Sequence, residues 1–363
     1  MRRRLALALP LLALVAAGPV RAQPAYEALN RSLTERVAVP AYARMAEAMA
    51  SLERTTTAFC EAPGPSTRQG AEGAFHAAME AWQRAQPFAM GPVTFEGRAA
   101  RIQFWPDKGG TAARQVRRAL QARNPALIAE GGLAGKSVAL QNLSTYERLL
   151  FSRGAAMASG QTSEDDRYAC ALAAAIARFQ AVLAAQIRDD WVKPGGFRDA
   201  VMTAAQGNAH FLDAKEAATA FLKSLSGTLE MAVRLKLERP LGKTIERARP
   251  KRAESWRSGR SLANIRANLV TARALYTAPD GFGELLAAAG ARALDTGLRR
   301  SFEEALALAD NLDRPLHEAV SDAATREQLQ ALLEKLRSLR VLISGPVAEE
   351  IGLVVGFNAL DGD

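Results

Sequence analysis

Apolar side chains recur every three or four residues along several long stretches of this chain. In the clearest case, a stretch that Thr162 or Ser163 opens, one stripe consists of Leu172, Ile176, Phe179, Leu183 and Ile187. This spacing places the apolar side chains on one face of an α-helix. Ala, Leu, Arg and Glu, all strong helix formers, dominate the composition, and no run of alternating β-branched residues indicates a sheet. We therefore predict an all-α protein.

The predicted helices are long, and short polar connections join them, which is typical of helical bundles. The boundary between two bundle subdomains, residues 23–195 and 196–363, is predicted at Pro194-Gly195-Gly196, because this motif ends the helix before it. In the first half, helices are predicted from Pro40 to about Cys60, around Phe75, Met79 and Trp82 up to Pro87, over about 112–121 and 137–151, and from Thr162 or Ser163 to Pro194. In the second half, helices are predicted from Phe211 to Leu229 and over 261–276, 294–308 and 326–342.

The first 22 residues have the pattern of an export signal. Three arginines, Arg2 to Arg4, precede an apolar run from Leu5 to Ala17, and Val20-Arg21-Ala22 offers small residues for cleavage before Gln23. The apolar run is too short to span a bilayer. We therefore predict a periplasmic or cell-envelope protein, and no later stretch is expected to anchor it in a membrane.

The chain is basic, with 47 Lys and Arg against 38 Asp and Glu. Removing the four arginines of the predicted leader lowers the net charge from +9 to +5. Because export excludes nucleic acid as a partner, an anionic envelope surface is the more sensible one. The basic segment from Arg247 to Arg252 is a candidate contact with such a surface, or else a solvated turn.

Two cysteines, Cys60 and Cys170, are present. In an oxidising periplasm a pair is predicted to form a disulfide, and two buried thiols are the alternative. A zinc site is disfavoured, since neither cysteine has a second cysteine or a histidine at ligand spacing.

The stretch from Gln141 to Phe151 carries one acid, Glu147, beside an apolar helical stripe, where a carboxylate needs a partner. Ser144, three residues earlier, projects to the same helix face and is one candidate partner; the arginines at 101, 148 and 153 are others. The stretch resembles the Gly-x-His-x-x-Glu helix of the imelysin-like family of bacterial envelope proteins. On this chain the Glu falls on Glu147, the His on Ser144 and the Gly on Asn142.

Three further blocks are similar to the same family and follow in order along the chain. They are residues 101–108, which contain Phe104-Trp105-Pro106-Asp107, residues 248–259, and residues 355–363. The resemblance implies two helical-bundle subdomains with the family's helix facing a cleft between them. Ser144, Trp105 and Asp107 are then candidate cleft or binding residues.

The resemblance also implies candidate activities. The family's namesake is described as a metallopeptidase, and other relatives are iron-regulated or belong to iron-uptake systems. There the His and Glu jointly hold a metal, but Ser144 is a poor ligand, and no His-Glu-x-x-His motif occurs in this chain. Another histidine could compensate, because each has an acid at helical spacing: His76 with Glu80, His210 with Asp213, and His317 with Asp313.

The leading hypothesis is a non-enzymatic binding or accessory protein linked to iron acquisition, with envelope or iron-uptake proteins as partners and no assured cofactor. The alternative is a metal-dependent peptidase that holds a divalent ion, iron or zinc, with Glu147, His210 and Asp213. A structural envelope protein with an empty cleft is a third hypothesis.

Overall fold

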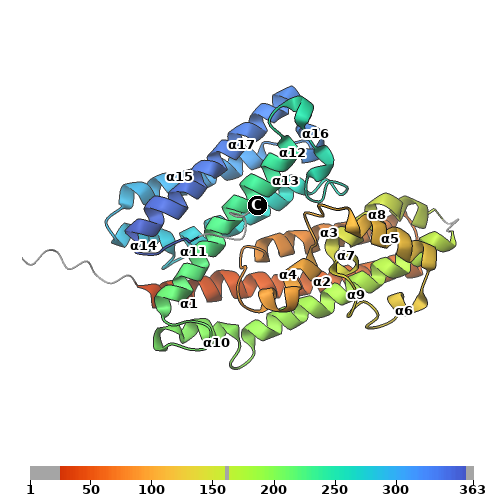
Figure 1. Cartoon of the computed structure of the whole chain (residues 1–363), viewed down its shortest axis with the longest axis horizontal. Coiled ribbons are helices and arrows are strands. Elements are labelled where there is room, and N and C mark those ends of the chain that lie inside the picture. The colour runs from red at the N-terminus through yellow and green to blue at the C-terminus, as the bar shows by residue number, and fades with distance from the viewer. Residues whose placement is uncertain (1–24, 160–162, 357–363) are drawn as a thin grey trace, which may run out of the picture.

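The computed structural model describes residues 25–159 and 163–356. The predicted leader, residues 1–22, and most of the block at 355–363 lie outside this range. Within it, every regular element is a helix, and two bundles lie one above the other in Figure 1. This confirms the all-α prediction.

The first bundle is built around two antiparallel helices, α2 (Val39–Glu61) and α9 (Glu164–Val192). The helices α3 (Pro65–Ala85) and α8 (Leu143–Met157) complete it: α3 packs on α2, and α8 packs on both α9 and α3. Shorter helices cover one side, namely α4 (Arg98–Ile102), α5 (Thr111–Ala122), α6 (Pro125–Ile128) and α7 (Val138–Gln141).

The second bundle consists of α11 (Ala214–Glu230), α13 (Ser261–Thr277), α15 (Arg292–Asp310) and α17 (Ala323–Leu342). Each helix contacts two others of this set, so the four close a ring around one apolar core. Shorter helices lie beside them, namely α12 (Arg239–Leu241), α14 (Phe282–Ala288) and α16 (Leu316–Ala319).

The two bundles touch chiefly where α3 packs against α13. In addition, α1 (Tyr26–Leu33) packs against α11, while α10 (Phe197–Met202) packs against α9 and α1. The predicted arrangement of two bundles is therefore confirmed. The boundary between residues 195 and 196 stays a prediction.

Three helices continue through a proline by widening into a π-helical segment. The first runs from Tyr26 through the π segment Thr34–Ala38 into α2. Pro40 lies in the first turn of α2, as the sequence suggested, whereas the helical stretch before it was not predicted. The others are Met231–Glu238, before Pro240, and Ile343–Val347, which contains Pro346. Proline lacks an N–H and its ring clashes with the preceding turn, and a π turn changes the register there without ending the helix.

The disulfide prediction is confirmed. Cys60, near the end of α2, is bonded to Cys170, in the second turn of α9, with 5.6 Å between their Cα atoms. The bond joins the two central helices of the first bundle at one end.

One helical segment bears on the expectation that no later stretch anchors the chain in a membrane. The segment Glu164–Met202 is long and apolar enough to cross a bilayer by length and composition, although no such span was predicted after the leader. However, 56% of its apolar window is buried inside the protein, because the segment contains α9, which supplies much of the first bundle's core. A helix that packs against several neighbours of the first bundle, as α9 does, needs this apolar composition.

Candidate functional site

A cleft of about 450 Å³ lies between the two bundles. The first bundle contributes residues 104–112 and the start of α8, and the second contributes Arg239 and the segment 251–257. The predicted cleft is thus present. The three cleft residues proposed from the sequence, Trp105, Asp107 and Ser144, line it, and so does the candidate metal ligand Glu147.

The start of α8 is fixed by Asn142. Its side-chain oxygen accepts hydrogen bonds from the backbone N–H groups of Ser144 (2.8 Å) and Thr145 (3.1 Å). Asparagine is among the preferred residues for capping a helix N-terminus. The predicted helix over 137–151 is therefore interrupted here: α7 ends at Gln141 and α8 starts at Leu143. The cap points Ser144 and Glu147 toward the second bundle.

Glu147 is almost completely buried, with 3% of its surface exposed. Its carboxylate accepts hydrogen bonds from both the backbone N–H (2.9 Å) and the hydroxyl (2.8 Å) of Ser258. Burial raises the pKa of Glu147, while the bonds from Ser258 and the charge of Arg257 oppose this shift. The partners are therefore in the other bundle: Ser258, and the backbone N–H of Arg257, which also opposes the rise in pKa. In the described part of the chain, neither Ser144 nor the side chain of an arginine donates a hydrogen bond to Glu147.

Trp105 and Asp107 come from the loop after α4. The Trp105–Pro106 peptide bond is cis, and Trp105 is half-buried in the cleft wall. The two oxygens of Asp107 accept hydrogen bonds from the backbone N–H groups of Thr111 and Ala112, each at 2.9 Å. Because the first turn of a helix has unpaired N–H groups, Asp107 stabilises the start of α5 while it lines the cleft.

The segment 251–258 of the second bundle is held from behind by a buried ion pair. Glu254, which points away from the cleft, lies 2.9 Å from the amine of Lys236, and each residue is 1% exposed. Side-chain amides surround the pair: Gln83 and Gln103 donate to one oxygen of Glu254, and Asn264 to the other. These bonds fix the backbone that presents Ser255, Trp256 and Arg257 to the cleft.

The other candidate ligands are not brought to this cleft. His210 and Asp213 were expected to open a helix, but α11 begins at Ala214, and Asp213 is its N-cap. His210 lies in the preceding loop, where its ring is 5.3 Å from that of Phe197. The side-chain oxygen of Asn208 accepts hydrogen bonds from the backbone N–H groups of His210 and Phe211, so this segment forms a turn ahead of α11.

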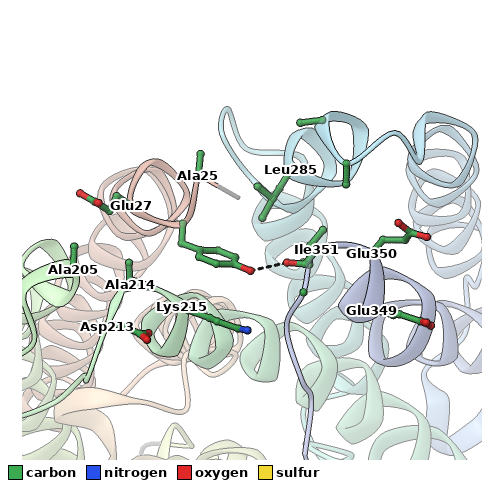
Figure 2. A pocket seen from close by; sticks show the side chains of 14 residues that line it. Ala25, Glu27, Ala205, Asp213, Ala214, Lys215, Leu285, Glu349, Glu350 and Ile351 are labelled. Carbon is green, nitrogen blue, oxygen red and sulfur yellow. Dashed lines mark hydrogen bonds between the residues drawn. The ribbon is translucent and has the colours of Figure 1, made fainter. Parts of the chain in front are cut away.

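Asp213 lines a different pocket of about 740 Å³ between α1, α11 and the end of α18 (Ala348–Glu350). The hydroxyl of Tyr26 crosses it and donates to the carbonyl of Ile351 at 2.7 Å (Figure 2). Figure 2 shows the carboxylates of the pocket spread around its rim, and they do not converge on one point. They belong to Glu27, Asp213, Glu349 and Glu350.

The ring and ion-pair contacts of the other two histidines, His76 and His317, are with residues other than Glu147. His76 packs against the rings of Phe75 and Phe151 on the first bundle, and its pKa is lowered by burial and by the charge of Arg260. His317 packs on Trp256 and lies 3.7 Å from Glu318.

The donor set around Glu147 does not fit a divalent metal. In the described residues no group of three or more His, Cys, Asp or Glu side chains could hold one, whereas protein sites for iron or zinc use about three or four such ligands. The neutral Ser144 takes the histidine position, and Ser258 engages the carboxylate of Glu147.

Sequence reasoning missed several residues of the site. Nothing near Glu147 in the sequence pointed to Ser258, Arg239 or the buried pair Lys236 and Glu254, because they lie 89 to 111 positions away from it. The one available signal was the family-like block 248–259, which contains Glu254 and Ser258. The block indicated that this segment is shared with the family, but it did not indicate which residues the segment contacts.

Comparisons with known proteins agree with the fold. A family model described as imelysin matches residues 38–343. The chain is 24% identical over 249 residues to iron-regulated protein A of Synechococcus elongatus, a match that covers 68% of this chain and 63% of the relative, less than two thirds of its length.

Two solved structures are similar. An imelysin-like protein from Psychrobacter arcticum 273-4 superposes with a TM-score of 0.76 and 20% identity, over 92% of this chain and 97% of its own. A putative iron-regulated protein A precursor from Parabacteroides distasonis ATCC 8503 superposes with a TM-score of 0.73 and 15% identity, over 93% of this chain and 97% of its own. At this level of identity the two structures establish a shared fold.

Proposed function

Because the chain belongs to the imelysin family, we propose that it is an exported cell-envelope protein that binds a ligand in the cleft between its bundles without chemically changing it. The observation that carries this proposal is the cleft itself. Two segments far apart in sequence, the start of α8 and residues 251–257, meet there around a space of about 450 Å³, a size typical of ligand sites.

The state of Glu147 supports binding over catalysis. A general base needs a carboxylate oxygen within hydrogen-bond reach of the substrate or of a water molecule. The Glu147 carboxylate is buried and accepts two hydrogen bonds from Ser258. This contact joins the two walls of the cleft, so the role proposed for Glu147 is to hold them together.

Export is supported by three observations. The first 22 residues have the leader pattern, the Cys60–Cys170 disulfide is typical of an oxidising compartment, and one structural relative is described as a precursor. The intact mass of protein recovered from the periplasm is expected to correspond to a start at Gln23. A full-length mass in the membrane fraction would contradict export.

A role in iron acquisition is proposed from the names of two relatives, which are called iron-regulated protein A. The partners would be envelope or iron-uptake proteins. The exposed basic segment 247–252 is proposed to face an anionic envelope surface, since its arginines and Lys251 are largely in contact with solvent.

The binding role is tested by filling the cleft. Ser144→Trp places a large side chain in it, and Val341→Trp, at an exposed position on α17 outside the cleft, is the control. In a thermal-shift screen of small metabolites, we expect ligands that stabilise the wild type and Val341→Trp but not Ser144→Trp, and we expect mass spectrometry to recover them unchanged.

Catalysis is tested on the same proteins. Peptide mixtures incubated with the wild type, with and without added iron or zinc, are expected to remain intact. Cleavage that disappears in Glu147→Ala, or a ligand that is recovered chemically altered, would overturn the non-enzymatic proposal.

A further inference from the structure

Most of the charged residues that line the cleft are basic. Its walls contain six basic side chains and two acidic ones. Both acids are already engaged: Asp107 with the start of α5, and Glu147 with Ser258. The basic residues come from both bundles: Lys108 and Arg148 from the first, and Arg239, Lys251, Arg252 and Arg257 from the second.

Two of the guanidinium groups lie in each other's field. Arg148 and Arg257 are both half-buried, and neither forms an ion pair with a carboxylate in the described part of the chain. Burial lowers the pKa of Arg257, and the positive charge of Arg148 lowers it further. Burial also lowers the pKa of Arg148, and the charges of Asp107 and Glu147 oppose this effect only in part. Like charges held close together in a cleft are stabilised by a shared anion.

The remaining lining residues offer a further hydrogen-bond donor and two flat apolar surfaces to a ligand. The Nη1 atom of Arg239 is buried and has no hydrogen-bond partner in the described residues. Trp256 lies beneath two cations, with Arg257 at 4.3 Å and Lys251 at 5.6 Å from its ring centre, which fixes them against an apolar surface. The half-buried Trp105 adds a second flat apolar surface.

We propose that the cleft binds a small organic polyanion, with two or more carboxylate or phosphate groups, held between Arg148 of the first bundle and Arg257 of the second. Guanidinium groups match both kinds of oxyanion with paired hydrogen bonds. The volume accommodates a small molecule. The charge of the cleft also opposes a bare divalent cation, so a metal would reach it as part of an anionic chelate. This inference rests on the proposed function, in which the cleft is the ligand site.

The test is calorimetric titration of the full chain at low salt with citrate, inorganic pyrophosphate, acetate and spermine. Citrate or pyrophosphate is expected to bind at least about tenfold more tightly than acetate, and spermine is expected not to bind. The stronger of the first two distinguishes a carboxylate ligand from a phosphate ligand. Affinity is expected to fall as salt rises, because salt screens the charges.

Arg148→Gln and Arg257→Gln are each expected to weaken binding about tenfold or more, which corresponds to the loss of one charge-assisted hydrogen bond. The control is Arg300→Gln, which removes the same charge at an exposed position on α15. Unliganded Arg148→Gln is expected to unfold at the same temperature as the wild type or higher, since it relieves the repulsion. If it fails to fold, Lys251→Gln and Arg252→Gln, which are exposed on the cleft rim, take its place.

The outcomes separate the two proposals. Equal binding of the anion to wild type, Arg148→Gln and Arg257→Gln would overturn the polyanion inference. A neutral or cationic ligand that Ser144→Trp excludes would overturn it too and leave the binding role standing. If the anions do not bind at millimolar concentration, the inference is wrong, and the screen with Ser144→Trp decides the binding role independently.

Discussion

At the scale of single residues, Glu147 shows which contacts offset the burial of an acid. Its burial is offset by an N–H and a hydroxyl from Ser258 and by the nearby positive charge of Arg257. Hydrogen bonds to a charged group contribute about 1.5–3 kcal/mol each. The Ser144 hydroxyl contributes none of these bonds, so its substitution for histidine leaves the Glu147 contact intact.

The raised pKa of Glu147 predicts a pH-dependent contribution to stability. Because the folded protein holds this proton more tightly than the unfolded chain, the contribution is complete below the ordinary glutamate pKa and is lost as pH rises through the folded pKa. In Glu147→Gln this loss is absent, so the free energy of unfolding of the variant relative to the wild type is expected to increase between about pH 4 and pH 8.

Urea denaturation across this range measures the effect. The control is Glu327→Gln, at an exposed position on α17, for which the difference from wild type is expected not to follow the same trend. A difference for Glu147→Gln that falls as pH rises would show that Ser258 and Arg257 outweigh burial.

At the scale of elements, long helices set the shape, and local devices adjust them. The π segments allow three helices to pass a proline. One of them, Met231–Glu238, carries Lys236 toward the buried pair with Glu254. The disulfide joins α2 to α9 at one end, so the central pair of the first bundle stays together even if that end frays.

The disulfide is predicted to be a large part of the stability of the first bundle. It closes a loop with a sequence separation of 110 residues, which corresponds to at most about 4–5 kcal/mol in the loop-entropy model. Reduction is expected to lower the midpoint of urea unfolding. The double variant Cys60→Ser/Cys170→Ser should be as unstable as the reduced wild type and insensitive to reductant. Peptide mapping that finds two alkylated thiols in periplasmic protein would contradict the prediction.

At the scale of the whole molecule, a buried polar network joins the bundles behind the cleft. Lys236 of the second bundle donates to Gln83 and Gln86 of the first, and also to Asn268. Gln103 of the first bundle donates to Glu254. Because every polar group in such a network needs its partner, the network specifies one relative position of the bundles, and hence the width of the cleft.

Lys236→Met is therefore expected to destabilise the protein by about 3–5 kcal/mol, since it leaves the charge of Glu254 buried without its partner. Adding Glu254→Leu should restore a substantial part of this loss. Lys335→Met removes a lysine from an ion pair with Glu304 at the surface and is expected to cost at most about 1 kcal/mol. Chemical denaturation of the four proteins tests this, and equal effects of the two lysine substitutions would contradict it.

The sequence by itself determined the helices, the family and the pairing of the cysteines. The limits of α9 follow from the cap at Ser163 and the stop at Pro194-Gly195-Gly196, and both signals act over a few residues. The leader pattern and the family-like blocks are local as well. The same local signals did not reveal the π segment that joins α1 to α2 ahead of Pro40, or the turn that Asn208 forms ahead of α11.

Only the tertiary structure decided what meets in the cleft. The bond between Glu147 and Ser258 spans 111 positions, and the cations of the cleft come from four separate segments. Helix periodicity shows which face of a helix is apolar, but it does not show which other helix packs against that face. The partner of Glu147, the burial of Lys236 and the charge of the cleft are therefore consequences of how the two bundles pack.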